Sequence, residues 1–373
     1  MTDNPARTPL YEWHAAHGGR LVDFAGWAMP VQYTSIVAEH QATRTACGLF
    51  DISHMGRLRF DGAGAERFLD ALVTRRVAGQ QPGRIRYALV TNDRGGILDD
   101  VLVYHLRDQA GQSYFVMVVN AGNRLKILDW LAPRLAAAHD VVCQDVTRHW
   151  AMLAVQGPRA LDLAQPLVDD VELCSMKYYS GAETGIAGHG GVVSRTGYTG
   201  EDGCELMLGA AAVAGIWQRL VDAGAVPAGL GCRDTLRLEA AMPLYGHELS
   251  EDIDPFQAGL EFAVDLDGRQ FPGRDALAAL QSRADRPRRV GLHLGGKRVP
   301  RQGFAVTAGN GEVGQVTSGT FSPTLQTPIA MAYVEPAFAG PGTELAVDIR
   351  GQPEPARVVP LPFYRRRQPH EGS

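Results

Sequence analysis

The chain has 373 residues, of which 45% are hydrophobic and 21% charged, and its formal net charge is −5. This length exceeds what one hydrophobic core usually holds, so we expect two or three domains. The balance of 36 Lys and Arg against 41 Asp and Glu argues against a protein that binds nucleic acid or a membrane surface.

The five cysteines are scattered and never stand in a CxxC pair. This pattern argues against a disulfide framework and a zinc site, and it is typical of a reducing compartment. The first residues, MTDNPARTPLYEWH, lack the apolar stretch of a secretory signal. No stretch approaches the ~18 consecutive apolar residues of a membrane span. We therefore expect a cytoplasmic protein without a bound metal.

The first part of the chain predicts a cycle of helices and strands. Helical spacing of apolar positions marks residues 36–47 and 63–73, with an alternating, strand-like segment between them. Residues 87–106 are typical of strand, turn and strand, because NDRGG supplies the Asn, Asp and Gly that tight turns favour. A further strand over 114–120 and an amphipathic helix over 121–138 complete the cycle.

A second cycle follows, with a strand at 150–157, a helix at 158–168, a hairpin at 191–209 and a helix at 211–224. This rhythm indicates α+β subdomains with antiparallel sheets. From about residue 288 the chain changes to short strands with Gly and Pro turns, which favours a separate β-barrel or sandwich. We therefore expect three units in two domains: two intertwined α+β subdomains within one module, and an all-β, barrel-like C-terminal domain. The expected boundaries are 1–275 for the module, 276–287 for a linker and 288–373 for the barrel.

Two adjacent carboxylates, Asp99 and Asp100, stand at the start of the apolar run VLVY in GGILDDVLVYHL (95–106). Aspartate is depleted in strands and is almost never fully buried without a partner. Successive side chains of a strand point to opposite faces, so we expect only one of the two to face a pocket. From the residues alone, a structural role and a chemical role remain equally open.

The stretch SRTGYTGEDGCE (194–205) combines glycines, which permit close approach of a ligand to the backbone, with Glu201, Asp202 and Glu205. It lacks the GK[ST] of a phosphate-binding Walker loop. A tight acidic turn between two strands is the commoner explanation of such a loop.

Arg233 follows GLG (229–231) near the expected start of a helix, where the helix dipole favours anions. An arginine there therefore indicates either an external carboxylate or an ion pair with a neighbour such as Asp234 or Glu239.

Taken together, these segments resemble the aminomethyltransferase (T-protein) family of the glycine cleavage system. The resemblance is carried, in order, by VDFAGWAMPVQYTSI, GLFDISHMG, GGILDDVLVY, VVNAGN, VSRTGYTGEDGCELML, AGLGCRDTLRLEAAMPLYGHEL, VGQVTSGTFSPTL and PFYRR. It implies three domains around a central hole that holds a folate: two subdomains form a folate-binding aminomethyltransferase module, and the third is the barrel. It also implies that a one-carbon unit passes from the aminomethyl-lipoyl arm of a carrier, the H-protein, to tetrahydrofolate. The products are 5,10-methylenetetrahydrofolate, ammonia and the dihydrolipoyl carrier.

The resemblance also implies roles for single residues. Asp100 matches the family's catalytic aspartate, whose proposed role is to accept a hydrogen bond from the bridging nitrogen of the folate. Proton relay and electrostatic stabilisation of a cationic iminium-like species remain alternatives for it. Glu205 and Arg233 match positions at the pterin, and Tyr364 matches a residue that closes the site from the tail. Further pocket-lining positions match Met55, Tyr87, Asn120, Tyr179 and Tyr198.

Two other functions stay open beside the aminomethyltransferase. One is a tetrahydrofolate-dependent demethylase of a small methyl donor, which would not require the lipoylated carrier. The other is a non-catalytic folate-binding protein of iron–sulfur maintenance. Such relatives carry a KGCYxGQ-type segment, and the corresponding place here reads LYGHELSEDIDPFQAGL without it.

Overall fold

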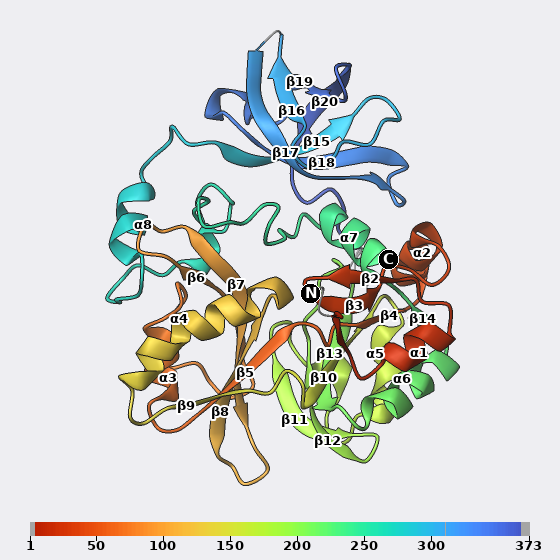
Figure 1. Cartoon of the computed structure of the whole chain (residues 1–373), viewed down its shortest axis with the longest axis vertical. Coiled ribbons are helices and arrows are strands. Elements are labelled where there is room, and N and C mark those ends of the chain that lie inside the picture. The colour runs from red at the N-terminus through yellow and green to blue at the C-terminus, as the bar shows by residue number, and fades with distance from the viewer. Residues whose placement is uncertain (1–3, 310, 367–373) are drawn as a thin grey trace.

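The computed structural model describes residues 4–309 and 311–366, whose strands form two large open sheets, a small N-terminal sheet and a closed barrel (Figure 1). The first sheet and its helices lie at lower left, the second at lower right, and the barrel above them. The α+β fold with an all-β C-terminal part is therefore confirmed. Among the residues that the structure describes, no helix is both long and apolar enough to cross a membrane.

The first sheet has five strands in the order β6-β7-β8-β5-β9, all paired antiparallel. Apolar side chains of this sheet and of helices α3 (Ala65–Asp70) and α4 (Arg124–Ala136) form one core. The expected turn NDRGG joins β6 to β7. The strands are β5 (Gly56–Asp61), β6 (Ile85–Thr91), β7 (Ile97–Arg107), β8 (Ser113–Val119) and β9 (Val142–Asp145).

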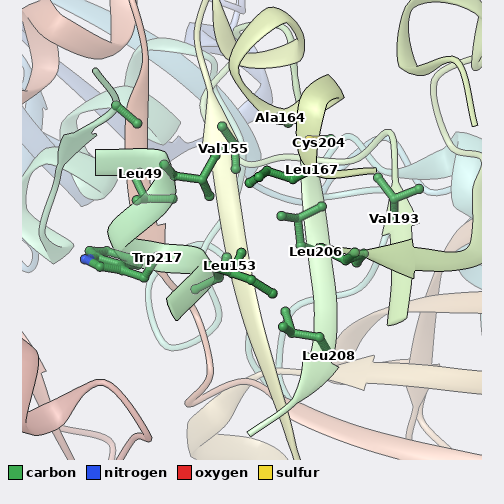
Figure 2. Close-up of a cluster of buried hydrophobic side chains, with 14 of the residues drawn as sticks. Leu49, Leu153, Val155, Ala164, Leu167, Val193, Cys204, Leu206, Leu208 and Trp217 are labelled. Atoms are coloured by element: carbon green, nitrogen blue, oxygen red, sulfur yellow. The ribbon is translucent and has the colours of Figure 1, made fainter. Parts of the chain in front are cut away.

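The second sheet has six strands in the order β11-β12-β13-β10-β4-β14, with one parallel pair, β14 and β4. Its core lies against α5 (Ala160–Ala164) and α6 (Val213–Asp222), where Leu153, Leu206 and Trp217 are buried (Figure 2). The expected hairpin is the pair β12 and β13. The strands are β4 (Gly48–Asp51), β10 (Trp150–Gln156), β11 (Gly181–Ile186), β12 (His189–Ser194), β13 (Gly203–Gly209) and β14 (Val226–Pro227).

The two sheets are intertwined along the chain, because all of the first sheet is inserted between β4 and β10 of the second. They also share a core, to which Tyr104, Val116 and Val118 come from one sheet and Met152 and Met207 from the other. Burying both inner faces against each other fixes the relative position of the sheets.

Further elements pack beside the two large sheets. Helix α1 contacts β3 of a small N-terminal sheet, order β1-β3-β2, and helix α7, which adds Cys232 and Leu236 to the shared core, packs against α2 and against the barrel. Their bounds are β1 (Ala6–Arg7), α1 (Tyr11–Ala16), β2 (Leu21–Phe24), β3 (Trp27–Pro30), α2 (Ile36–Thr45) and α7 (Leu230–Glu239). The short 3₁₀ helices are η1 (Ala121–Asn123), η2 (Gln165–Leu167), η3 (Leu173–Ser175), η4 (Glu261–Ala263) and η5 (Pro336–Phe338).

The C-terminal part is a closed six-stranded barrel in the order β15-β18-β17-β16-β19-β20, with every pair antiparallel. Of the two architectures left open for this region, barrel and sandwich, the structure shows the barrel. Alternate residues of its strands fill the interior. The strands are β15 (Arg288–Leu294), β16 (Ala305–Ala308), β17 (Gly311–Ser322), β18 (Thr327–Val334), β19 (Glu344–Asp348) and β20 (Pro353–Val359).

The stretch 276–287, expected to be a linker, is helical in its first part. Helix α8 (Arg274–Leu280) runs into it and buries Leu277 against the turn that joins β6 to β7, near Gly95. Leu280 lies against the same turn, so apolar contacts hold the start of the stretch on the first sheet.

Candidate active site

A cavity of about 750 Å³ opens between the two sheets at the end of their shared core. Leu102, Val118 and Met152 belong to both the core and the cavity wall. Helix α7 and residues 241–247 close another side, and Arg289 of the barrel reaches the wall. Apolar and aromatic walls with a few polar groups are typical of sites for small organic ligands, and the volume is in their usual range.

Strand β7 brings one of its two aspartates to this cavity. Asp100 lines it, on the same face as Leu102, whereas Asp99 shares the opposite face with Val101 and Val103, which belong to the core beneath α3 and α4. The alternation expected from the sequence is therefore observed. Asp99 is fully buried.

The two carboxylates are nevertheless joined by one side chain, which the sequence did not predict. The Nδ2 of Asn120 donates to Oδ1 of Asp99 at 2.9 Å and to Oδ1 of Asp100 at 2.7 Å. Asn120 follows β8, beyond the last residue that pairs with β7, so its side chain reaches past the strand end to both faces. The hydroxyl of Tyr87 on β6 donates to Oδ2 of Asp100 at 3.3 Å.

Burial raises the pKa of both aspartates, and for Asp99 the charge of Asp100 adds to the rise. Hydrogen bonds from Asn120, Asn123 and Tyr87 oppose this effect but do not cancel it. Two interacting carboxyls titrate as a pair. Asp100 can therefore accept a proton under conditions in which an exposed aspartate would be too weak a base.

Glu205 lies on β13, where it lines the cavity and is 5% exposed. The hydroxyl of Thr196, from the loop that joins β12 to β13, donates to its Oε2 at 2.5 Å. Burial raises the pKa of Glu205, and the hydrogen bond from Thr196 and the charge of Arg233 oppose the rise. Because Glu205 lines the cavity, its carboxylate can accept further hydrogen bonds from a ligand there.

Helix α7 presents Leu230, Arg233 and Arg237 to the cavity at helical spacing, while Cys232 and Leu236 enter the shared core. The Arg233 guanidinium lies 4.8 Å from the ring centroid of Tyr198. Its Nη1 is buried and has no hydrogen-bond partner among the residues that the structure describes. Neither Asp234 nor Glu239 forms the ion pair with Arg233 that the sequence left open; both pair with other arginines.

Aromatic side chains form another wall. Tyr87 stacks on Phe262 with 5.9 Å between ring centroids, and Phe262 is 58% exposed. Tyr179 also lines the cavity, and its backbone has φ of 57°, a left-handed conformation that is uncommon for a bulky residue. The Tyr198 hydroxyl donates to the carbonyl oxygen of Pro243 at 2.5 Å, which orients its ring.

The structure thus brings eight of the nine expected site residues to one cavity. They are Asp100, Glu205, Arg233, Met55, Tyr87, Asn120, Tyr179 and Tyr198.

Tyr364, expected to close the site, is not among the lining residues. Its hydroxyl donates to Glu201 at 2.7 Å, and the Arg44 guanidinium lies 4.0 Å from its ring centroid. The backbone N–H of Tyr364 also donates to the carbonyl oxygen of Glu239. These contacts hold the C-terminal tail against Arg44, Glu201 and Glu239.

Several lining residues were not identified from the sequence. Asn123 follows Asn120 by three residues in VVNAGN, and that spacing after a strand was the available signal. His54 precedes Met55 in DISHMG; burial lowers its pKa to about 3, so it is a neutral imidazole. Phe262 has no sequence signal that we can name.

Comparison with known proteins decides the family. Residues 10–268 match the family profile described as GCVT N-terminal domain, and residues 288–365 match the glycine cleavage T-protein C-terminal barrel domain. The chain belongs to the aminomethyltransferase family, the T-proteins of the glycine cleavage system. The resemblance expressed by the sequence motifs is therefore confirmed, and the chain is an aminomethyltransferase.

Similar family members cover nearly the whole chain. The aminomethyltransferase of Rubrobacter xylanophilus is 50% identical over 97% of this chain and 95% of its own length. That of Synechococcus elongatus is 45% identical over 97% and 96%, respectively. The crystal structure of glycine cleavage system aminomethyltransferase T from Bartonella henselae matches with a TM-score of 0.90 at 33% identity, covering 97% of this chain and 98% of that one.

Within the part of the aminomethyltransferase that the structure describes, no group of three or more His, Cys, Asp or Glu side chains is placed to hold a metal ion.

Proposed function

We propose that this aminomethyltransferase moves the one-carbon unit from the aminomethyl-lipoyl arm of the H-protein to tetrahydrofolate. The products are 5,10-methylenetetrahydrofolate, ammonia and the dihydrolipoyl carrier. The observation that supports this most is the convergence of Asp100, Glu205 and Arg233 on one cavity from β7, β13 and α7.

The cavity residues fit a reduced folate. The buried Glu205 carboxylate can accept hydrogen bonds beyond the one from Thr196. Its two oxygens can bind a ring N–H and a neighbouring amino group through two parallel hydrogen bonds. Arg233, whose Nη1 has no hydrogen-bond partner among the described residues, supplies a donor for polar ring atoms. Met55, Tyr198 and Tyr179 supply apolar and aromatic surface for a flat heteroaromatic ligand.

Asp100 is proposed as the catalytic residue. Burial keeps its pKa raised, so that its carboxylate accepts a hydrogen bond or a proton from an amine of the folate as nitrogen attacks the aminomethyl carbon. The same negative charge stabilises positive charge that develops at that carbon. Asn120 and Tyr87 hold the carboxylate in place for both tasks.

The H-protein is proposed as the partner that delivers the substrate, and the cytoplasm as the compartment. The compartment is supported by the five cysteines, which are all free thiols in the structure.

The deciding experiment measures ammonia release with tetrahydrofolate, in the presence and absence of aminomethyl-loaded carrier. We expect release only with both, and loss of about 10²-fold or more in the Asp100→Asn variant, with the dissociation constant for tetrahydrofolate little changed. Carrier-independent methyl transfer from a small donor would instead establish the demethylase. Full activity of Asp100→Asn would overturn the role of Asp100.

A further inference from the structure

We infer that Asp99 is a positioning residue of the transfer reaction: through Asn120 it holds the Asp100 carboxylate toward the cavity, and its charge makes Asp100 a stronger proton acceptor. This inference rests on the catalytic role proposed for Asp100. It extends that proposal to a carboxylate on the opposite face of the strand, which lines no part of the cavity.

The first step is that Asp99 fixes the conformation of Asn120. Its Oδ2 accepts the backbone N–H of Asn120 at 3.0 Å, and its Oδ1 accepts the side-chain Nδ2 of the same residue at 2.9 Å. Asn123 adds a donor to Oδ1 at 2.6 Å. Because both carboxylate oxygens of Asp99 engage Asn120, the amide has little freedom to rotate.

The second step is that the fixed amide orients Asp100. The same Nδ2 donates to Oδ1 of Asp100 at 2.7 Å and to its carbonyl oxygen at 3.2 Å. With carboxylate oxygens of both aspartates around it, the amide must present its NH₂ group rather than its oxygen. Removing Asp99 therefore frees the group that aims Asp100.

The third step concerns charge. Asp99 accepts three hydrogen bonds from Asn120 and Asn123, whereas Asp100 accepts one from Asn120 and a longer one from Tyr87. Hydrogen bonds to a carboxylate favour its ionised form, so the three that Asp99 accepts favour a negative charge on Asp99 when the pair is half ionised. Repulsion between two carboxylates is mutual, so whenever Asp99 is ionised its charge raises the pKa of Asp100 above the value that burial alone would set.

Other titratable groups also face the cavity. Four phenols lie where the charge of Asp100 acts on them, and burial raises the pKa of each, which keeps them neutral. Glu205 and the arginines Arg233, Arg237 and Arg289 line the cavity as well. Lys126 of α4 donates to the Tyr245 hydroxyl at 2.8 Å and pairs with Glu251, so its charge is partly balanced. The phenols are Tyr87 on β6 and Tyr179, Tyr198 and Tyr245 on the surrounding loops.

The test measures how kcat/KM for the reaction with the aminomethyl-loaded carrier depends on pH in three variants. The acid limb of this profile is the range in which activity falls as Asp100 takes up a proton. In Asp99→Asn the charge is lost, so the acid limb moves about one pH unit lower, and kcat on the plateau falls about 3- to 10-fold while KM for tetrahydrofolate changes little. In Asp99→Glu the charge remains, so the acid limb stays at the wild-type position although kcat falls. The matched control is Asp93→Asn, which removes an exposed carboxylate from the turn of the same hairpin and leaves the profile unchanged.

The outcomes separate this inference from the proposed function. If Asp100→Asn is inactive but Asp99→Asn loses activity without any shift of the acid limb, Asp99 is structural and only the inference fails. If Asp100→Asn is fully active, both fail. Should Asp99→Asn not fold, a shift of the acid limb in Asp99→Glu as large as one pH unit overturns the inference, and an unmoved limb with a lowered kcat supports it.

Discussion

Arg44 of α2 donates two hydrogen bonds to the same carboxylate oxygen of Glu239 in α7; the distances from Nε and Nη2 to Oε2 are 3.2 and 2.9 Å. Its Nη1 donates to Glu201 at 3.0 Å. Glu239 also accepts hydrogen bonds from the hydroxyls of Ser322 and Thr324, where the barrel turns from β17 to β18. One buried ionic group thus joins α2, the cavity helix α7 and the barrel.

Replacement of Arg44 by methionine is expected to lower the free energy of unfolding by about 3–5 kcal/mol, because it removes the arginine shared by two buried carboxylates. Glu239 keeps His40 as a partner, whereas Glu201 loses its basic partner. Urea unfolding followed by tryptophan fluorescence measures the loss. The control is Arg67→Met, which removes an exposed pair with Asp140 and is expected to cost less than about 1 kcal/mol. Equal losses in the two variants would contradict the assignment.

The raised pKa of Asp100 also predicts how stability depends on pH. A carboxyl whose pKa is raised on folding contributes stability that is fully present below its ordinary value and is lost as the pH rises through the raised value. Asp100→Asn should therefore be more stable than the wild type by on the order of 1 kcal/mol at pH 8, with a smaller difference near pH 4. Thermal unfolding across this range tests the prediction. A variant less stable than the wild type at pH 8 would contradict it.

Glu205→Gln is expected to weaken the binding of tetrahydrofolate about 10- to 100-fold, because a neutral amide replaces a charge-assisted acceptor of two hydrogen bonds. Titration calorimetry under anaerobic conditions measures the dissociation constant. Glu183→Gln is the matched control: Glu183 lies on β11, accepts a hydrogen bond from Tyr114 at 2.6 Å and lines no part of the cavity. Unchanged affinity in Glu205→Gln would remove Glu205 from the folate site.

Tyr364→Phe tests whether Tyr364 contacts the substrate or only packs against Arg44 and Glu201. Since the Tyr364 hydroxyl donates to Glu201 and does not line the cavity, we expect KM for tetrahydrofolate to stay within about twofold. The free energy of unfolding should fall by about 1 kcal/mol through loss of that hydrogen bond. A large rise in KM without a loss of stability would place Tyr364 at the substrate.

Local chain properties were enough to predict much of this arrangement. The period of two along β7 assigns Asp99 and Asp100 to opposite faces, and it depends only on strand geometry. The spacing of apolar residues likewise predicts α2 and α6, although their ends shift by one or two residues because the last turns depend on neighbours. The acidic stretch 194–205 was expected as a turn between two strands, and β12 and β13 flank it.

The contacts that make the site depend on residues far apart in sequence. Glu205 and Arg233 line the same cavity as Asp100 only because the inner faces of the two sheets bury a common core and α7 packs beside it. The sharing of Asn120 by both aspartates follows from where β8 stops pairing with β7, which no periodicity encodes.

By itself, the sequence determined most strands and helices of the two sheets and the barrel, the opposite faces of Asp99 and Asp100 on β7 and, through its motifs, the family. The tertiary structure alone decided that Asp99 is coupled to Asp100, that the Nη1 of Arg233 has no hydrogen-bond partner among the described residues, and that Tyr364 lies with Arg44 outside the cavity. The physical reason is that periodicity depends on residues close together in sequence. Hydrogen bonding and burial of charged groups depend on which distant segments pack together in the folded chain.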